Sequence, residues 1–310
     1  MEHLYLHFYL GLGEIMDIGL CGVLYVLEIG FLELGLIYFC GECNKMSVIN
    51  TIINDDVLVG LKQIPDGVVS LVVSSPPYNT GGRTLRYDNY DDNISYLDYL
   101  IWLKSVFIEC KRVLRTGGRF CINIDAIRNR EDGDDKKCYI RDIRTDLCNI
   151  MKEIGMMFFG EHIWFKNGQW SGKKTSWGSY KSCSFPTVQR SFEYILIYSK
   201  EQFRLEKNNE SLDSDITAKE FQIYIDSTWS IQPETQNRCG HPAVFPLELP
   251  MRCIKLYSYP NDVILDCFAG TGTTLLAAKK LKRRYIGIDN SKRYCDYAKE
   301  RLLFDNDIFG

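Results

Sequence analysis

The chain has 310 residues and a formal net charge of −3, and 45% of its residues are hydrophobic and 25% charged. This composition fits a globular protein with one large α/β domain and an insert, or with two modest domains. It excludes a protein that binds nucleic acid through a global positive charge, so any such surface has to be local. The 12 cysteines are scattered and no secretory signal is visible, which indicates reduced thiols in the cytoplasm.

Residues 1–45 differ from the rest of the chain. They contain no Lys or Arg before Lys45, so they lack the basic start of a signal peptide. Their apolar stretch is interrupted by Glu28 and Glu33, which disfavours a membrane span. We interpret them as an N-terminal extension without function, which an early start codon would explain. Cys40 and Cys43 form the only CxxC pair, and without a second pair we expect no metal.

From residue 50 onward, short apolar runs alternate with segments of helical periodicity. The sequence predicts strands at 51–54, 68–73, 120–124, 157–165, 192–198, 263–266 and 285–289, and helices at 57–64, 94–114, 139–154, 216–225, 245–257, 273–281 and 293–303. This alternation indicates an α/β fold with a doubly wound, mostly parallel sheet. We expect one domain over residues 46–303, an insert at about 201–235 and a tail at 304–310.

The predicted strand at 263–266 runs through a glycine turn into a helix. Gly270 and Gly272 allow a tight turn and close approach of a ligand, and Asp289, at the end of the next strand, could accept hydrogen bonds from a ribose. A phosphate-binding Walker loop would need a lysine after the turn, and a dinucleotide fingerprint a glycine where Leu275 stands. S-adenosylmethionine shares the adenosine and carries no phosphate. A plain strand-turn-helix without ligand is the other interpretation.

The predicted strand at 68–73 is followed by Ser75-Pro76-Pro77-Tyr78. Proline cannot continue a sheet ladder, so taken alone this segment could be a strand stopped by proline with a packed tyrosine. It also places a hydroxyl, a carbonyl of fixed direction and an aromatic ring at the rim of the sheet.

Three motifs in this order resemble the amine-methylating DNA methyltransferases, in the circularly permuted group whose catalytic motif precedes the cofactor motif. They are Ser75-Pro76-Pro77-Tyr78, His241-Pro-Ala-x-Phe245-Pro246 and Asp266-x-Phe268-x-Gly270-x-Gly272, and the resemblance covers about residues 50–303. It implies a Rossmann-like fold, S-adenosylmethionine as cofactor and an exocyclic amine of DNA as substrate. No proline is followed by cysteine, which disfavours covalent methylation of cytosine carbon 5.

The resemblance implies a catalytic role for the four residues of the Ser-Pro-Pro-Tyr turn. The Ser75 hydroxyl and the Pro76 carbonyl would accept the two N–H bonds of the amine and free its lone pair. Tyr78 would stack on a base that has left the duplex. For the cofactor, the implied set is Asp56, Phe245, Pro246, Asp266, Phe268, Gly270, Gly272, Thr273 and Asp289. Asp56 could instead cap the helix that follows, and Phe268 could instead be a core residue.

Basic residues mixed with aromatic ones predict the DNA contacts. Arg83 and Arg86 follow the catalytic turn, and residues 161–190 hold five basic residues against one acid. The candidates are Arg83, Arg86, Lys173, Lys174, Trp177, Lys181 and Arg190. A solvated basic face over core tryptophans is the alternative. Residues 201–235 are the candidate region for recognition of the target sequence.

We therefore expect a site-specific methyltransferase of a restriction-modification system, acting on a flipped base in double-stranded DNA. By resemblance, Ser before Pro-Pro favours the N4 amine of cytosine, whereas Asp in that place is commoner for the N6 amine of adenine. Adenine N6 methylation, an RNA or protein-glutamine substrate, and an inactive DNA-binding module are the alternatives. The expected partners are DNA and a cognate endonuclease, with no membrane, and the enzyme would be a monomer or homodimer.

Overall fold

The structure is a computed structural model. It describes residues 48–79, 88, 94–125, 140–166, 181–184, 188, 191–234 and 244–304, together with the backbone of a few short strands. The chain divides into two units, Met1–Ser47 and Val48–Gly310. In the first unit, β1 (Val23–Tyr25) and β2 (Ile37–Phe39) pair in antiparallel fashion.

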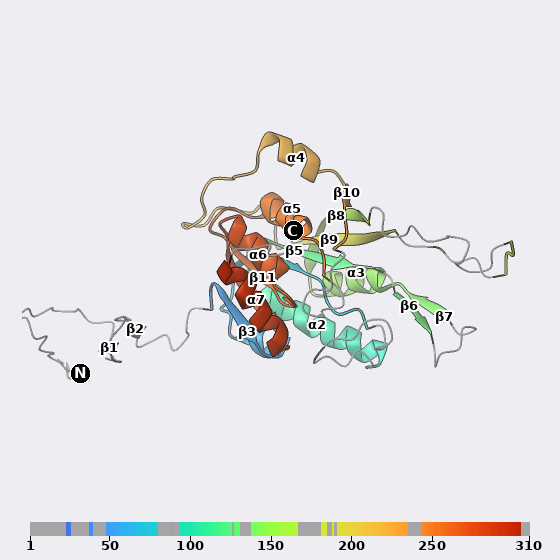
Figure 1. The fold of residues 1–310 in the computed structure, drawn as a ribbon, viewed down its shortest axis with the longest axis horizontal. Coiled ribbons are helices and arrows are strands. Elements are labelled where there is room, and N and C mark those ends of the chain that lie inside the picture. Colours follow the sequence, from blue (N-terminus) through green and yellow to red (C-terminus); the bar gives the residue numbers. More distant parts are fainter. Residues whose placement is uncertain are drawn as a thin grey trace, which may run out of the picture. The chain divides into compact units, whose positions relative to one another are not determined.

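The second unit contains an eight-stranded sheet in its described part, with the order β10-β8-β9-β5-β4-β11-β12-β3 (Figure 1). Its strands are β3 (Thr51–Asn54), β4 (Val69–Ser74), β5 (Leu114–Ile124), β8 (Met156–Lys166), β9 (Phe192–Lys200), β10 (Thr228–Ile231), β11 (Val263–Asp266) and β12 (Arg284–Asp289). All neighbours are parallel except β9, which is antiparallel to both β5 and β8. The predicted mostly parallel sheet is confirmed.

Helices cover both faces of this sheet. They are α1 (Val57–Lys62), α2 (Tyr96–Val113), α3 (Ile143–Glu153), α4 (Ala218–Tyr224), α5 (Glu248–Tyr257), α6 (Thr273–Lys280) and α7 (Lys292–Phe304). One core joins the sheet to α1, α2 and α3, and a second joins it to α5 and α6 (Figure 1). Every residue of β4 and β11 is buried, which explains why these strands are continuous apolar runs.

The first strand of the unit lies beside the last. β3 pairs in parallel with β12, from Thr51 opposite Ile286 to Asn54 opposite Asp289. The two ends of the unit therefore meet at one side of the sheet, although Asn54 and Asp289 are 235 residues apart in the sequence.

Several element boundaries differ from the sequence expectation. The helix predicted at 139–154 begins at Ile143, because β7 (Cys138–Arg141) pairs with β6 (Ile127–Arg130) and the Asp142 side chain caps the helix. The helix predicted at 245–257 begins at Glu248, since a turn comes first in which Leu249 N donates to Pro246 O at 3.1 Å. β10 was not predicted; only four residues long, it buries Trp229 and Ile231. No helix within the described residues is long and apolar enough to cross a membrane.

Candidate active site

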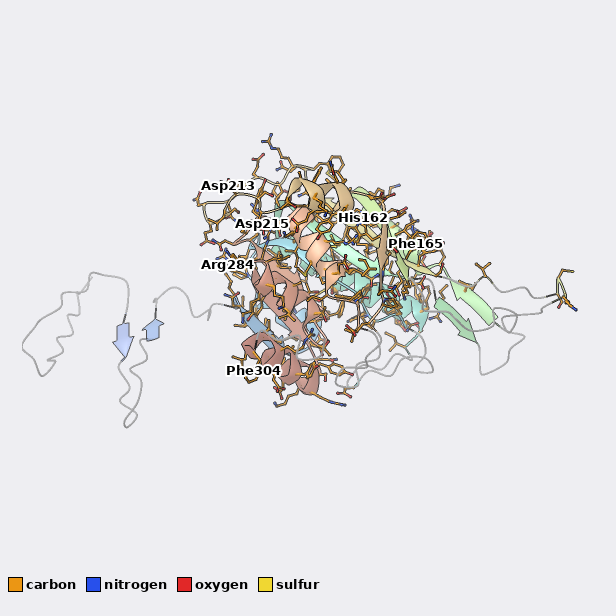
Figure 2. The ribbon with its side chains drawn as sticks, turned by 45° about the horizontal axis from the view of Figure 1, so that its top comes forward. His162, Phe165, Asp213, Asp215, Arg284 and Phe304 are labelled. Atoms are coloured by element: carbon orange, nitrogen blue, oxygen red, sulfur yellow. The ribbon has the colours of Figure 1, made fainter. Side chains whose placement is uncertain are left out.

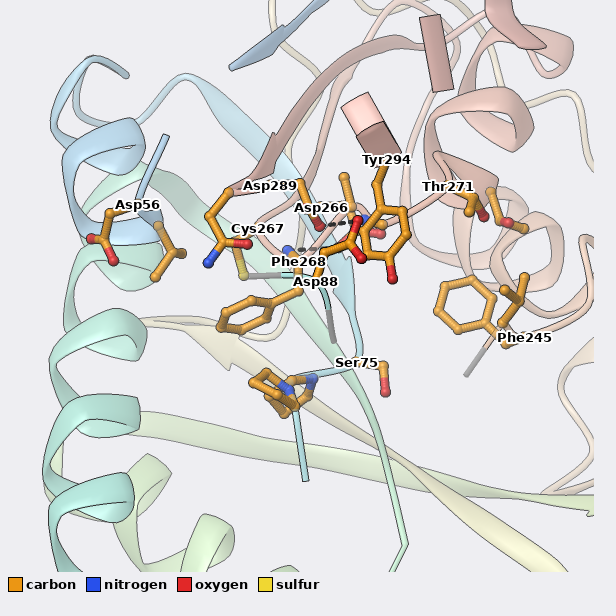
Figure 3. Close-up of a pocket in the computed structure, with 18 of the residues that line it drawn as sticks. Asp56, Ser75, Asp88, Phe245, Asp266, Cys267, Phe268, Thr271, Asp289 and Tyr294 are labelled. Atoms are coloured by element: carbon orange, nitrogen blue, oxygen red, sulfur yellow. Dashed lines mark hydrogen bonds between the residues drawn. The ribbon is translucent and has the colours of Figure 1, made fainter. Parts of the chain in front are cut away.

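Parallel strands bring four chain segments to one edge of the sheet. β4, β11, β12 and β3 all end there, so the turn after each strand faces the same space. A cavity of about 270 Å³ opens between these turns (Figure 3). Its lining comprises Asp55, Asp56, Val57, Ser75, Pro76, Pro77, Tyr78, Asp88, Trp102, Val244, Phe245, Asp266, Cys267, Phe268, Ala269, Gly270, Thr271, Thr273, Asp289, Asn290 and Tyr294.

The cavity brings together most of the residues that the sequence nominated for catalysis and cofactor binding. All four residues of the Ser-Pro-Pro-Tyr turn line it, and so do seven of the nine nominated cofactor residues. Gly272 and Pro246 are the two that do not, although each is directly next to a lining residue. Figure 3 shows Asp56 and Phe245 at opposite ends of the site, with Phe268 and Asp289 between them.

The Ser-Pro-Pro-Tyr turn is supported by α2. Tyr99 is fully buried on this helix, and its hydroxyl donates to the Pro77 carbonyl at 2.7 Å. Within the turn, the Ser75 hydroxyl donates to the Tyr78 hydroxyl at 3.3 Å. The chain leaves the turn at Asn79, whose backbone has a φ of 53° and whose side-chain amide donates to Ile94 O at 3.0 Å. The proline backbone and this support from Tyr99 fix the turn before any ligand arrives.

The glycine turn after β11 depends on glycine at two positions. Gly270 and Gly272 have φ values of 48° and 77°, in the left-handed region that side chains disfavour. A Cβ on Gly272 would lie 2.7 Å from the Ala298 Cβ of α7, so the turn is also packed tightly. Arg301 of α7 is buried and donates to Thr271 O at 2.7 Å and to Thr273 Oγ1 at 3.2 Å. α7 thereby fixes the shape of this turn.

Asp289 ties the end of β12 to the glycine turn. Its Oδ2 accepts from Gly270 N at 2.8 Å, and its Oδ1 accepts from Ser291 N at 2.9 Å. Burial raises the pKa of Asp289 above its usual value, while these two backbone bonds oppose the shift. Each carboxylate oxygen has two lone pairs, so both oxygens can still accept one hydroxyl from a ligand.

Asp266 lies at the end of β11, fully buried between two turns. Its Oδ1 accepts from Ser74 Oγ at 2.6 Å and from Phe268 N at 3.1 Å. Burial raises the pKa of Asp266 to about 6, against the opposing effect of these bonds. Ser74 directly precedes Ser75, so Asp266 connects the Ser-Pro-Pro-Tyr turn to the glycine turn.

For Asp56 and Phe268 the sequence left two roles open. Asp56 does cap α1, since its Oδ1 accepts from Leu58 N at 2.9 Å, and it also lines the cavity. Phe268 packs against the core and also lines the cavity, with its ring 5.7 Å from that of Trp102. The observed geometry is compatible with both roles at both positions.

Sequence reasoning missed other lining residues, above all Asp55, Asp88, Trp102 and Tyr294. Trp102 follows Tyr99 by three residues, so the helical periodicity of α2 does place both on one face. Asp55 precedes the predicted cap, and nothing in its local pattern distinguishes it. Tyr294 comes from the first turn of α7, which meets the cavity through tertiary packing alone.

The cavity lining is acidic. It includes five aspartates, Asp55, Asp56, Asp88, Asp266 and Asp289, and among the described lining residues there is no lysine or arginine. Such a lining disfavours a phosphate-bearing ligand and suits one with a positive charge. No group of His, Cys, Asp and Glu that could hold a metal ion occurs in the part of the chain that the structure describes.

Most of the nominated DNA-binding residues lie outside the described residues: Arg83, Arg86, Lys173, Lys174, Trp177 and Arg190, as does His241. Lys181 is exposed. Two members of the basic, aromatic stretch at 161–190 belong to β8, where Trp164 is buried and Lys166 is half-buried. Trp164 is buried and its Nε1 donates to Ile231 O at 2.8 Å, and Lys166 pairs with the buried Glu193. The buried Trp164 matches the alternative of core tryptophans, and the DNA-binding role of the stretch stays a prediction.

The insert at 201–235 runs from the amino ends of the parallel strands to their carboxyl ends. It begins at the amino ends of the parallel strands, where Arg115 Nη1 donates to Glu206 O at 2.6 Å and Arg283 pairs with Asp215 at 2.7 Å. Figure 2 shows Asp215 and Arg284 on the opposite side of the domain from Phe165, which is near the end of β8. Only after β10 does the segment reach the edge that holds the cavity. Its role in DNA recognition stays a prediction.

The comparisons with known proteins agree with this geometry. Residues 69–300 match the N6/N4 methyltransferase family model, described as DNA methylase. The chain belongs to this DNA methylase family. Among curated relatives, the Type II methyltransferase M.MjaVI of Methanocaldococcus jannaschii is 33% identical over 193 residues, covering 62% of this chain and 90% of that protein. The Type II methyltransferase M.HinfI of Haemophilus influenzae is 27% identical over 283 residues, covering 84% and 70%.

Solved structures of DNA methylases have the same fold. A putative DNA modification methylase from Thermus thermophilus, complexed with S-adenosyl-L-methionine, is 28% identical with a TM-score of 0.65, covering 84% of this chain and 96% of that one. PvuII DNA methyltransferase, which is cytosine-N4-specific, has a TM-score of 0.62 at 20% identity, covering 84% and 87%. At that identity the likeness concerns the fold. The expected Rossmann-like methyltransferase fold is therefore confirmed.

Proposed function

We propose that this protein transfers a methyl group from S-adenosylmethionine to the exocyclic N4 amine of cytosine in double-stranded DNA. One observation carries the proposal. The Ser-Pro-Pro-Tyr turn and the glycine turn line the same cavity, and Ser74 and Asp266 join them through a buried hydrogen bond of 2.6 Å. An amine acceptor and a cofactor site are thus built next to each other at one edge of the sheet.

The charge of the cavity, its hydrogen-bond acceptors and its apolar rings suit S-adenosylmethionine. The cofactor carries a sulfonium and an ammonium group, and five aspartates without a lysine or arginine among the described lining residues favour such a cation. Asp289 has one lone pair left on each oxygen for the two ribose hydroxyls. Phe268 and Trp102 offer apolar ring surface to the adenine, and Asp56 offers an acceptor to its amino group.

The residues of the catalytic turn act on the amine. The bound cofactor supplies a methyl group activated by the sulfonium. The amine is a poor nucleophile because its lone pair is conjugated with the base. Ser75 Oγ and the Pro76 carbonyl accept its two N–H bonds, which favours a pyramidal nitrogen with a free lone pair directed at the methyl group. The fixed φ of Pro76 aims its carbonyl in advance, and Tyr78 stacks on the flipped base with about 1–3 kcal/mol.

The choice of cytosine N4 rests on Ser75. In the family that the sequence resembles, a serine before Pro-Pro is typical of enzymes that methylate cytosine N4, whereas an aspartate is commoner in enzymes that methylate adenine N6. The cytosine ring is smaller than the adenine ring, and its amine needs one firm acceptor, which a hydroxyl provides. A carboxylate is the stronger acceptor and would hold an adenine amine more tightly. We also propose the permuted motif order, which the pairing of β3 with β12 supports. DNA is the proposed partner, with a restriction endonuclease as the enzyme's counterpart.

Purified protein and methyl-labelled S-adenosylmethionine test the proposal directly. Duplex DNA, single-stranded RNA and denatured protein are offered in parallel, with Ser75→Ala as the control variant. We expect label in DNA alone, and a loss of label with the variant. Label in RNA or protein with none in DNA would contradict the substrate class. Binding of the cofactor and of DNA without transfer to any substrate would favour the inactive binding module.

A further inference from the structure

A second group of polar side chains lies behind the catalytic turn, outside the cofactor cavity. Glu193 of β9 is its centre and is only 8% exposed. Its Oε2 accepts from Asn123 Nδ2 of β5 at 2.9 Å, and its Oε1 pairs with Lys166 Nζ at the end of β8. None of these three residues lines the cofactor cavity. β4, β5, β9 and β8 are neighbours in the sheet, so the group runs along the edge from which the catalytic turn projects.

This group is connected to the catalytic serine through the tyrosine of the turn. Ser75 Oγ donates to Tyr78 Oη at 3.3 Å, and Tyr78 Oη donates to Glu193 Oε2 at 3.5 Å. Both contacts are longer than a strong hydroxyl bond, which is typical of catalytic hydrogen bonds before substrate tightens them. The chain therefore runs from serine to tyrosine to carboxylate.

The carboxylate at the end of this chain determines its direction. An ionised carboxylate can only accept hydrogen bonds, so in the contact between Tyr78 and Glu193 the tyrosine hydroxyl is the donor. The Tyr78 oxygen then accepts the Ser75 proton. With its proton turned away from the base, Ser75 presents its lone pairs to the amine, as an acceptor of an N–H bond must. Lys166 and Asn123 donate to the same carboxylate, and the Lys166 ammonium balances its charge.

We propose that Glu193 is a positioning residue for methyl transfer, which orients the Ser75 hydroxyl through Tyr78 so that it accepts from the target amine. This inference rests on the proposed function and extends it. A turn with a neutral hydroxyl would otherwise present proton and lone pair at random to the amine. Glu193 thus supplies from β9 the directing negative charge that Ser75 itself lacks.

Steady-state kinetics of four proteins test this: the wild type, Glu193→Gln, Tyr78→Phe and the double variant. A glutamine can donate as well as accept, so it no longer fixes the direction of the chain. We expect Glu193→Gln to lower kcat for methyl transfer by about tenfold or more, in the range of lost preorganised contacts. The KM for S-adenosylmethionine should stay within about twofold, because the group lies outside the cofactor cavity.

The double-variant cycle separates positioning from simple support of the fold. If Glu193 acts through Tyr78, its substitution should have almost no further effect once the Tyr78 hydroxyl is gone. The proposal would be overturned if the double variant lost kcat by the product of the two single losses, or if Glu193→Gln left kcat unchanged. Glu193→Asp, which keeps the charge on a shorter side chain, should recover part of the lost rate.

Two further variants guard against misfolding. Glu193→Gln leaves the half-buried Lys166 without its acid, so the pair Glu193→Gln with Lys166→Met removes both charges together and should show the same loss of kcat. Glu161→Gln is the control, since Glu161 of β8 forms its ion pair with Arg144 of α3 and not with a member of the Glu193 group; its kcat should be unchanged. An inactive wild type would contradict the proposed function itself. An active wild type with unaltered Glu193 variants would contradict only the positioning role.

Discussion

Ser74 donates a hydrogen bond of 2.6 Å to Asp266, and both residues are the last of their strands. The residue after Ser74 begins the Ser-Pro-Pro-Tyr turn, and the residue after Asp266 begins the glycine turn. The two halves of the site are thus joined by one buried bond between neighbouring strands. This bond spans 192 residues of sequence, so it exists only once β4 and β11 have paired.

Asp266 should make stability depend on pH. Burial raises its pKa from 3.8 to about 6, so the folded state binds its proton more tightly than the unfolded state. The stabilisation from that proton is fully present below about pH 4 and is lost as the pH rises through 6, about 3 kcal/mol for a shift of this size. Urea unfolding of the wild type and Asp266→Asn between pH 4 and 7 measures it. The free energy of unfolding of Asp266→Asn should rise relative to that of the wild type as the pH rises. A difference between the two proteins that does not change with pH would contradict this.

Gly272→Ala should disturb the glycine turn. The backbone φ is 77°, and the new methyl group would lie 2.7 Å from the Ala298 Cβ. We expect a loss of about 1–3 kcal/mol in the free energy of unfolding and weaker binding of S-adenosylmethionine. Chemical denaturation and calorimetry measure the two effects. An alanine variant with normal stability and affinity would show that the turn tolerates a side chain.

Arg301 should act on cofactor affinity as well as on stability. Its guanidinium donates to Thr271 O at 2.7 Å and so fixes the glycine turn from α7. Arg301→Met should raise the Kd for S-adenosylmethionine by about tenfold, as expected for a loss of about 1.4 kcal/mol. Arg283→Met is the control, because Arg283 is equally buried and donates to Ser258 O at 2.7 Å, far from the cavity lining. Equal losses of affinity in both variants would assign the effect to general destabilisation.

Asp289→Ala should weaken the binding of S-adenosylmethionine. The substitution removes the proposed ribose acceptor and also the acceptor of Gly270 N and Ser291 N. Because hydrogen bonds to a charged group contribute about 1.5–3 kcal/mol, we expect the Kd to rise roughly tenfold to a hundredfold. Calorimetric titration compares it with Asp213→Ala, an exposed acid outside the cavity lining. An unchanged Kd would remove Asp289 from the cofactor site.

The parts of the site that sequence reasoning found are those with local causes. The glycine turn and the proline turn each follow directly on a strand, and Asp289 is the last residue of its strand. Parallel strands bring such ends to one edge. Tyr99, Trp102 and Glu193 could not be placed in this way. Their contact with the site depends on how α2 and β9 pack, which no local pattern records. The same holds for the burial of Trp164, which follows from the pairing of β8 with β9 and β10, and for the ion pair of Lys166 with Glu193.

Mass spectrometry of nucleosides tests the central claim most directly. Plasmid DNA is prepared from cells that express the wild type or Pro76→Ala, which loses the fixed direction of the carbonyl. We predict N4-methylcytosine with the wild type and its absence with the variant. N6-methyladenine in its place would keep the mechanism and contradict the choice of base. No modified base with either protein, while the wild type is folded and binds S-adenosylmethionine, would contradict DNA methylation.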